Sequence, residues 1–213
     1  MLEDLIPRLA SLGIGYILGT FLTAEVVARH FAHTGAANLG DTGNPGMANI
    51  MASLGFVPGI LTLVGDLAKT LLSAILAWYF FGKEGWIVIL YAGLGTTLGH
   101  DFPFWRRFRG GKGVATTSLA IGLYHFPLGL LANLLGMGTV FATKYLCIAG
   151  PVIPICFALA MAWRGDWEAF ILSGILSLLS VFSHMGSLRG IKKGTTKKTD
   201  VLAAIQKKRK KAE

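Results

Sequence analysis

Charged residues are scarce in this sequence. Only 15% of its 213 residues are Asp, Glu, Lys or Arg, whereas 53% are hydrophobic, and the mean hydropathy is +0.59. A soluble domain of this size would have difficulty covering so much apolar surface with so few charges. The composition therefore indicates that lipid is the solvent for most of the chain.

Cysteine is also scarce, and motifs typical of metal sites are missing. The two cysteines, Cys147 and Cys156, lie in one apolar stretch at a spacing that fits neither a disulfide framework nor a zinc site. None of the five histidines is followed five positions later by Asp, so the His-x4-Asp pattern of soluble-loop and peripheral acyltransferases is missing too. We therefore expect no metal and no other cofactor.

Long apolar runs, in contrast, are abundant. Seven can be separated, at residues 9–27, 57–81, 86–98, 114–124, 126–143, 148–163 and 169–182. Several are shorter than the roughly 20 residues that a perpendicular membrane helix needs. We predict an all-α, polytopic membrane helix bundle with about seven transmembrane or partial helices, although five full spans also fit the sequence. Residues 114–124 are the best candidate for a partial helix, because irregular backbone within a membrane is tolerated where it lines a cavity.

Basic residues predict the orientation of this bundle. With seven spans and the N-terminus outside, three of the 20 Lys and Arg lie outside (Arg8, Lys83 and Arg164), Lys69 lies within a span, and the remaining 16 lie inside. We expect one integral membrane domain over residues 1–185 and a basic cytoplasmic tail over 186–213. The same basic residues predict contact with anionic lipid headgroups rather than with nucleic acid.

The first long polar loop, residues 38–49, has three glycines and three asparagines in twelve residues. Glycines let backbone N–H groups converge on an anion, and amide and hydroxyl side chains can complete a neutral cradle. A tight turn explains the same composition equally well when the loop is taken alone. The candidate residues here are Thr42, Gly43, Asn44, Gly46 and Asn49.

The second polar loop contains the run Gly110-Gly111-Lys112-Gly113 directly before an apolar segment. Free backbone donors, a helix N-terminus and an ammonium group then meet, as they do in phosphate sites. The loop is not a nucleotide P-loop, because Arg106 and Gly113 stand where that motif needs Gly and Ser or Thr. Contact with lipid headgroups explains Arg106 and Arg107 better than a role in a site does, whereas for Lys112 we favour function.

Three ionisable residues near or within the first two spans need separate explanations. Asp66 and Lys69 are three residues apart on one face of the second apolar segment, where they can neutralise each other. Such groups usually mark a cavity or a pathway, but a structural pair that fastens the bundle explains them equally well. Glu25 lies near an interface and is expected to be solvated.

The last span ends in a further candidate group. His184 lies at the inner boundary, where it could accept a proton or bind a substrate oxygen, and Arg189 could pair with phosphate. A lone interfacial histidine is more often structural, so both explanations stay open.

Taken together, these loops resemble the bacterial acyl-phosphate:glycerol-3-phosphate acyltransferases, small membrane enzymes that make lysophosphatidic acid. The resemblance runs from about residue 15 to 196. Its most specific part is Gly99-His100-x-Phe102-Pro103 followed by Phe108-x-Gly110-Gly111-Lys112-Gly113-Val114-Ala115-Thr116. Residues 41–49 resemble the first family motif, and Gly65-Asp66-x-x-Lys69 fits the second helix of the family.

Several positions depart from the family pattern. Ala52 and Gly190 stand where the family has Arg, Ser187 replaces Asn, and Thr196 replaces Glu. The two missing arginines matter because such groups would be expected to hold the phosphate of glycerol 3-phosphate, and Arg189 can replace one only if the local backbone permits. The chain therefore resembles a divergent member.

The resemblance implies transfer of a fatty acyl group from acyl phosphate to the 1-hydroxyl of glycerol 3-phosphate, with release of phosphate. It implies catalytic roles for Lys112, His184 and Asn44, with His184 or a substrate phosphate accepting the hydroxyl proton. Substrate binding is then expected from Thr42, Gly43, Gly46, Asn49, Asp66, Lys69, His100, Gly110, Gly111, Gly113, Ser187 and Arg189. The active-site loops are expected on the cytoplasmic side of the cell membrane.

Two alternatives stay open at this point. The altered motifs fit an enzyme with the same fold and another acceptor, or a homologue without activity. A small anion transporter is suggested by Asp66, Lys69 and the partial helix, although transporters of that kind usually contain an internal repeat, and none is visible here.

Overall fold

The computed structural model describes residues 2–40 and 43–199, and the regular secondary structure of these residues is entirely helical. The α-helices are α1 (Leu2–Gly19), α2 (Thr23–Ala32), α3 (Met47–Leu54), α4 (Phe56–Phe81), α5 (Ile87–Asp101), α6 (Val114–Tyr124), α7 (Phe126–Thr143), α8 (Leu146–Trp163) and α9 (Trp167–Lys192). Short 3-10 turns are η1 (Ala36–Asn38), η2 (Gly82–Glu84) and η3 (Phe104–Arg106). The predicted all-α class is confirmed.

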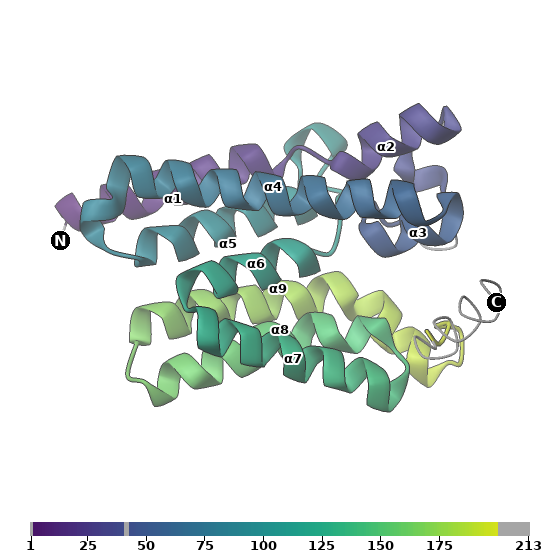
Figure 1. The fold of residues 1–213 in the computed structure, drawn as a ribbon. Coiled ribbons are helices and arrows are strands. Elements are labelled where there is room, and N and C mark those ends of the chain that lie inside the picture. Colours follow the sequence, from purple (N-terminus) through teal and green to yellow (C-terminus); the bar gives the residue numbers. More distant parts are fainter. Residues whose placement is uncertain (1, 41–42, 200–213) are drawn as a thin grey trace, which may run out of the picture.

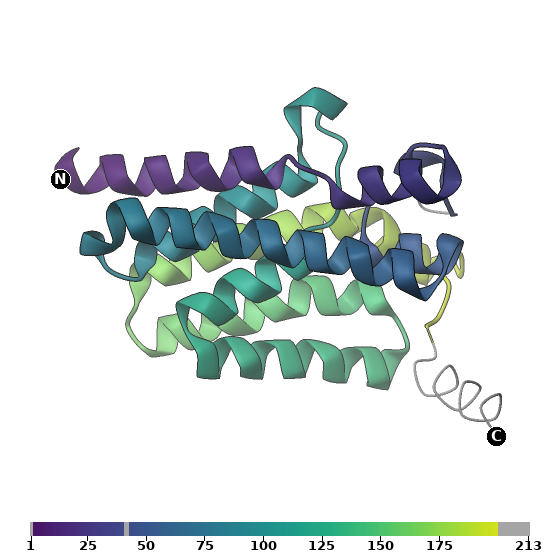
Figure 2. The same cartoon turned by 45° about the horizontal axis from the view of Figure 1, so that its top comes forward.

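The long helices form two groups joined by α5 and α6 (Figure 1). Helices α1, α4 and α5 pack together, as do α7, α8 and α9, while α6 contacts both α5 and α7. Both views place the N-terminus at one end of the bundle, and α2, α3 and the last turns of α9 at the other (Figures 1 and 2). We call this second end the loop end, since Lys112, between α5 and α6, contacts Ser187 in the last turns of α9 there.

Five stretches in the described part of the chain are long and apolar enough to cross a membrane: Asp4–Ala32, which includes both α1 and α2, Phe56–Glu84, Phe126–Thr143, Leu146–Trp163 and Trp167–Lys192. Their lengths and composition support the expected polytopic membrane protein. Helix α6, in contrast, has only 11 residues, and its bounds coincide with the partial helix that the sequence predicts.

Two details differ from the expected segments. The apolar run 9–27 is not one helix, because the backbone breaks between Gly19 and Thr23, and α3 occupies part of the segment expected to be the first loop. In addition, α9 extends to Lys192, six residues past the expected start of the tail at Gly186.

Glycines set the close contact of α1 with α5. A Cβ atom at Gly15 would lie 2.0 Å from the Ala92 carbonyl oxygen, and one at Gly95 would lie 2.0 Å from that of Leu12. Each helix has a second such glycine four residues later, Gly19 and Gly99, with the same crowding. This Gly-x-x-x-Gly spacing lets membrane helices approach until their backbones touch.

Polar contacts close the bundle at the opposite end. Arg8 donates from Nε and Nη2 to the two carboxylate oxygens of Glu168, at 2.6 and 3.1 Å, and the Tyr91 hydroxyl donates to the same carboxylate at 3.1 Å. These contacts join α1, α5 and α9. The ends of helices that are far apart in sequence are thereby held together.

Candidate active site

The glycine-rich loop before α6 folds back against the end of α5. Gly110 N–H donates to the Asp101 carbonyl and Gly111 N–H donates to the His100 carbonyl, both at 2.9 Å. These two amides cap α5, so the expectation that they are free donors for an anion is wrong. A Cβ atom at Gly111 would lie 1.9 Å from His100 Nε2, which explains why glycine is required there.

Lys112 lies between this turn and the N-terminus of α6. Its ammonium donates to Ser187 Oγ of α9 at 2.8 Å. Gly113, at φ +61°, is the N-cap of α6 and, as a glycine, has no side chain that could accept from the first N–H groups of this helix. Burial lowers the pKa of the Lys112 ammonium, and the nearby Asp101 carboxylate partly opposes that effect. Uncapped helix donors and a cation are therefore brought together, as the sequence predicts.

His184 lies one turn before Ser187 on α9 and is buried. Its Nδ1 lies 2.8 Å from the Ser180 carbonyl oxygen and therefore donates to it, which leaves Nε2 as the nitrogen able to accept a proton. The imidazole packs on Gly150 of α8, where a Cβ atom would lie 2.4 Å from the ring. Lys112 and His184 thus share one region of the loop end.

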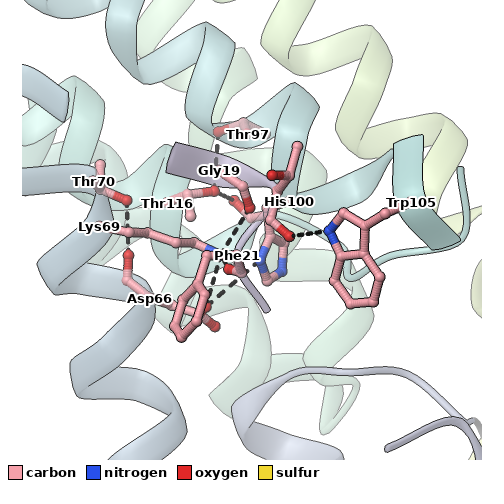
Figure 3. Close-up of polar contacts among 11 residues, drawn as sticks. Gly19, Phe21, Asp66, Lys69, Thr70, Thr97, His100, Trp105 and Thr116 are labelled. Atoms are coloured by element: carbon pink, nitrogen blue, oxygen red, sulfur yellow. Dashed lines mark hydrogen bonds and ion pairs between the residues drawn. The ribbon is translucent and has the colours of Figure 1, made fainter. Parts of the chain in front are cut away.

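Asp66, Lys69 and His100 form a buried cluster (Figure 3). Lys69 Nζ lies 3.0 Å from Asp66 Oδ1 and 2.7 Å from His100 Nδ1. Asp66 Oδ1 accepts no well-directed hydrogen bond from the described residues, so its contact with the ammonium is electrostatic rather than directional.

Lys69 also donates to the carbonyls of Gly19 and Phe21, at 3.3 and 2.9 Å, where α1 gives way to α2. Trp105 Nε1 donates to the Thr20 carbonyl between them at 2.9 Å. The Lys69 ammonium is thus already hydrogen-bonded to groups of the protein itself. This geometry favours a structural role over direct substrate contact for the Asp66 and Lys69 pair. His100 lies between Lys69 and Gly111 and supports the glycine-rich loop.

The first polar loop is stabilised by its own side-chain and backbone hydrogen bonds. Asn49 Nδ2 donates to the Leu39 carbonyl at 2.9 Å, and Gly46 N–H donates to the Asn44 carbonyl at 2.9 Å. Gly43, at φ +57°, lies so close to Ala37 that a Cβ atom would be 2.7 Å from its carbonyl oxygen. Of the expected candidates, Thr42 lies outside the described residues. The loop packs through α3 onto α2 and α4, and the hydrogen bond of Asn49 gives this residue a role in shaping it.

The last candidate, Arg189, is exposed on α9 and lies two residues beyond Ser187. Residues two apart on a helix point to different sides, so the structure does not bring Arg189 to Lys112. The adjacent Gly190 is covered by the following chain: Thr195 N–H and Thr196 N–H donate to its carbonyl, and a Cβ atom there would lie 2.4 Å from Thr196 Oγ1. An arginine at position 190, which the family pattern has, would require the side chains of Thr195 and Thr196 to move.

Comparison with known proteins identifies the family. The family model described as glycerol-3-phosphate acyltransferase matches residues 9–194. The chain belongs to the glycerol-3-phosphate acyltransferase family. It is 41% identical over 198 residues to glycerol-3-phosphate acyltransferase 1 of Lactobacillus johnsonii, covering 93% of this chain and 95% of that protein. It is 39% identical over 156 residues to the corresponding protein of Halorhodospira halophila, covering 70% and 75% of the two chains.

Solved structures agree with this assignment. The crystal structure of PlsY (YgiH), an integral membrane glycerol 3-phosphate acyltransferase in its glycerol 3-phosphate form, superimposes with a TM-score of 0.81 at 25% identity, over 93% of this chain and 98% of that one. A lysophosphatidic acid form of the same enzyme, 24% identical with a TM-score of 0.78, shares the fold. The predicted family, the membrane fold and the acyltransferase class are confirmed, and acylation of glycerol 3-phosphate belongs to phospholipid synthesis.

Reasoning from the sequence missed several residues of this acyltransferase. Ser183 Oγ donates to Asp101 Oδ2 at 2.6 Å, which ties α9 to the end of α5 directly beside the Lys112 loop. A charged residue at the end of an apolar segment was the available signal for Asp101, whereas nothing in the sequence indicates Gly150. The expectation that Glu25 is solvated is wrong: it is buried, and its carboxylate accepts hydrogen bonds from Ala36 N–H and Arg29 Nε.

Proposed function

We propose that this acyltransferase takes its fatty acyl group from acyl phosphate and transfers it to the 1-hydroxyl of glycerol 3-phosphate at the loop end. The products are lysophosphatidic acid and inorganic phosphate. The observation that carries this proposal is the position of the Lys112 ammonium, which is fixed by Ser187 beside the uncapped N-terminus of α6. A cation next to aligned N–H groups matches the phosphate of an acyl phosphate.

The reaction requires little from the protein beyond the positioning of its two substrates. Acyl phosphate is a mixed anhydride whose phosphate leaves readily, so no enzyme nucleophile is needed. The acceptor oxygen attacks the acyl carbon, the acyl–phosphate bond breaks, and phosphate departs with the electron pair. Lys112 and the first turn of α6 stabilise the negative charge that develops on the phosphate and the carbonyl oxygen.

The acceptor hydroxyl must lose its proton in this step. His184 Nε2 is the candidate acceptor, because Nδ1 is occupied by the Ser180 carbonyl. Asn44 and the glycines of the first loop then hold the phosphate of the acceptor. The acyl chain lies between apolar helices, which it enters sideways from the bilayer.

A donor comparison tests the proposal. Purified protein is given glycerol 3-phosphate with either palmitoyl phosphate or palmitoyl-coenzyme A, and both lysophosphatidic acid and phosphate are measured. We expect one phosphate per lysophosphatidic acid with palmitoyl phosphate and no product with the thioester. Turnover with the thioester alone, or phosphate release only with a different alcohol, contradicts the proposal.

The excess of basic residues on one side supports a cytoplasmic position for the loop end, with the N-terminus outside, and contact of residues 186–213 with anionic headgroups. Single cysteines at Lys83 and at Arg107, in a background without Cys147 and Cys156, test this orientation. We expect a membrane-impermeant thiol reagent applied to intact cells to label the cysteine at position 83. Labelling at position 107 instead indicates the reverse orientation.

A further inference from the structure

The first polar loop has no cation of its own. Between Arg29 and Lys69 the sequence contains neither Lys nor Arg. The ammonium of Lys69 is already engaged by backbone carbonyls, Asp66 and His100. Glycerol 3-phosphate carries a doubly charged phosphate at neutral pH. If it binds at this neutral loop, the positive charge that offsets the phosphate must come from another part of the protein.

Arg106, on the turn η3 of the second loop, is a cation that contacts α2, the helix before this loop. Its Nη1 atom lies 3.6 Å from Glu25 Oε2 of α2. That nitrogen is buried, and within residues 2–40 and 43–199 it has no hydrogen-bond acceptor. A buried guanidinium nitrogen without an acceptor is costly unless a ligand supplies one.

Neighbouring contacts fix the position of Arg106. Trp105 anchors η3 through its hydrogen bond to the Thr20 carbonyl, and the Arg106 guanidinium lies 5.9 Å from the centre of the Trp105 ring. Arg107, the next residue, is exposed and takes a left-handed backbone conformation at φ 54°. Headgroup contact therefore remains a suitable explanation for Arg107, whereas Arg106 is directed to the protein interior.

Glu25 connects Arg106 to the first loop. Its Oε2 accepts a hydrogen bond from Ala36 N–H at 3.0 Å, and the next residue, Ala37, is the one against which Gly43 packs. Its Oε1 accepts from Arg29 Nε at 3.2 Å. Two guanidinium groups thus surround one carboxylate, so the cluster keeps a net charge of about +1 and attracts an anion despite Glu25.

We propose that Arg106, positioned by Glu25, is the cation that binds the phosphate of glycerol 3-phosphate at the first loop. This inference rests on the proposed function for the identity of its ligand. Arg106 would then offset the absence of arginine at positions 52 and 190. Arg106 contacts the substrate, whereas Glu25 acts through Arg106 and through the loop backbone.

Binding of glycerol 3-phosphate to the purified protein tests the proposal without requiring turnover. We expect Arg106→Gln to weaken this binding about tenfold or more, because a charge-assisted hydrogen bond is lost. The matched control Arg107→Gln is expected to bind within about twofold of wild type, since its side chain is exposed. Arg106→Lys is expected to lie between them, because it keeps the charge and loses the planar fork.

Steady-state kinetics give the second readout. We expect Arg106→Gln and Glu25→Gln to raise the KM for glycerol 3-phosphate and to leave the KM for palmitoyl phosphate unchanged, a split that a general loss of folding would not produce. If Arg106→Gln does not fold, Arg106→Lys and Glu25→Gln decide the question.

Unchanged binding in Arg106→Gln, or a raised KM for palmitoyl phosphate alone, overturns the inference. A wild-type protein that does not bind glycerol 3-phosphate also overturns it. Wild-type binding that depends on Arg106, but without any acyl transfer from palmitoyl phosphate, supports the inference and rejects the proposed donor instead.

Discussion

Replacing Lys112 by Ala is expected to remove most of the activity while the protein stays folded. Among residues 2–40 and 43–199 the side chain makes one hydrogen bond, to Ser187 Oγ, and Lys112 lies outside the hydrophobic core. Removing one preorganised donor from a charge-stabilising site typically lowers kcat by about 10² to 10³, which corresponds to about 2.7–4 kcal/mol. Ser187→Ala keeps the ammonium but removes the hydrogen bond that fixes it, and is expected to raise the activation free energy by only about 0.5–1.5 kcal/mol.

Lys83 provides the matched control, because it is an exposed lysine at the opposite end of the bundle. Phosphate release from palmitoyl phosphate in the presence of glycerol 3-phosphate is measured for wild type, Lys112→Ala, Ser187→Ala and Lys83→Ala, with thermal unfolding of each as the folding check. A kcat of Lys112→Ala within about threefold of wild type would refute its role in charge stabilisation.

The same residue predicts a pH dependence. The ammonium form is the active one, and it is present below the pKa of Lys112. Burial lowers this pKa, so kcat/KM is expected to fall as the pH rises, at a lower pH than for an ordinary lysine. The guanidinium of Lys112→Arg stays charged at high pH. The remaining kcat/KM of this variant is therefore expected not to fall as the pH rises. An identical alkaline limb in both proteins would assign the decline to another group.

Three further changes have distinct expected results. Lys69→Met leaves Asp66 charged and buried without its partner, so we expect a loss of about 3–5 kcal/mol in the free energy of unfolding; a melting temperature equal to that of wild type would show that the pair does not fasten the bundle. Gly111→Ala places a Cβ atom 1.9 Å from His100 Nε2, and we expect it to destabilise the protein by about 1–3 kcal/mol and to lower kcat through displacement of the Lys112 loop. His184→Gln is expected to lower kcat by about 10² with little change in either KM, whereas an unchanged kcat would transfer proton acceptance to a substrate phosphate.

Much of the fold follows from local sequence patterns. Apolar length and turn residues define α6 and α7 at their observed bounds, because Gly113 and the His125-Phe126-Pro127 turn mark the limits of both helices. The run at Gly110 to Gly113 also identifies Lys112 correctly as a residue beside a helix N-terminus. In these segments the residues that determine the structure are neighbours in the sequence.

Other features depend on residues that are remote in sequence. The break after α1 is stabilised because Lys69 and Trp105 donate to the exposed carbonyls of Gly19, Thr20 and Phe21. Neither donor belongs to the apolar run 9–27, so the sequence of that run alone predicts one continuous helix. Periodicity within one segment cannot reveal a hydrogen bond supplied by another.

The prediction that the amides of Gly110 and Gly111 face an anion fails for the same reason, because their acceptors lie in another segment. A glycine-rich run indicates that backbone donors can converge, but not what accepts from them. The acceptors are the carbonyls of His100 and Asp101, at the end of the preceding helix. Glu25 illustrates the same limit, since its burial depends on Ala36 and Arg106, each on a different loop.

The positions of the two bound phosphates would test the proposed donor and acceptor sites most directly. An experimental structure of the protein with glycerol 3-phosphate and a stable acyl-phosphate analogue is the required measurement. We expect the donor phosphate at the N-terminus of α6 beside Lys112, and the acceptor phosphate at the first loop within reach of Arg106. Either phosphate bound beside Arg8, at the opposite end of the bundle, would contradict this arrangement.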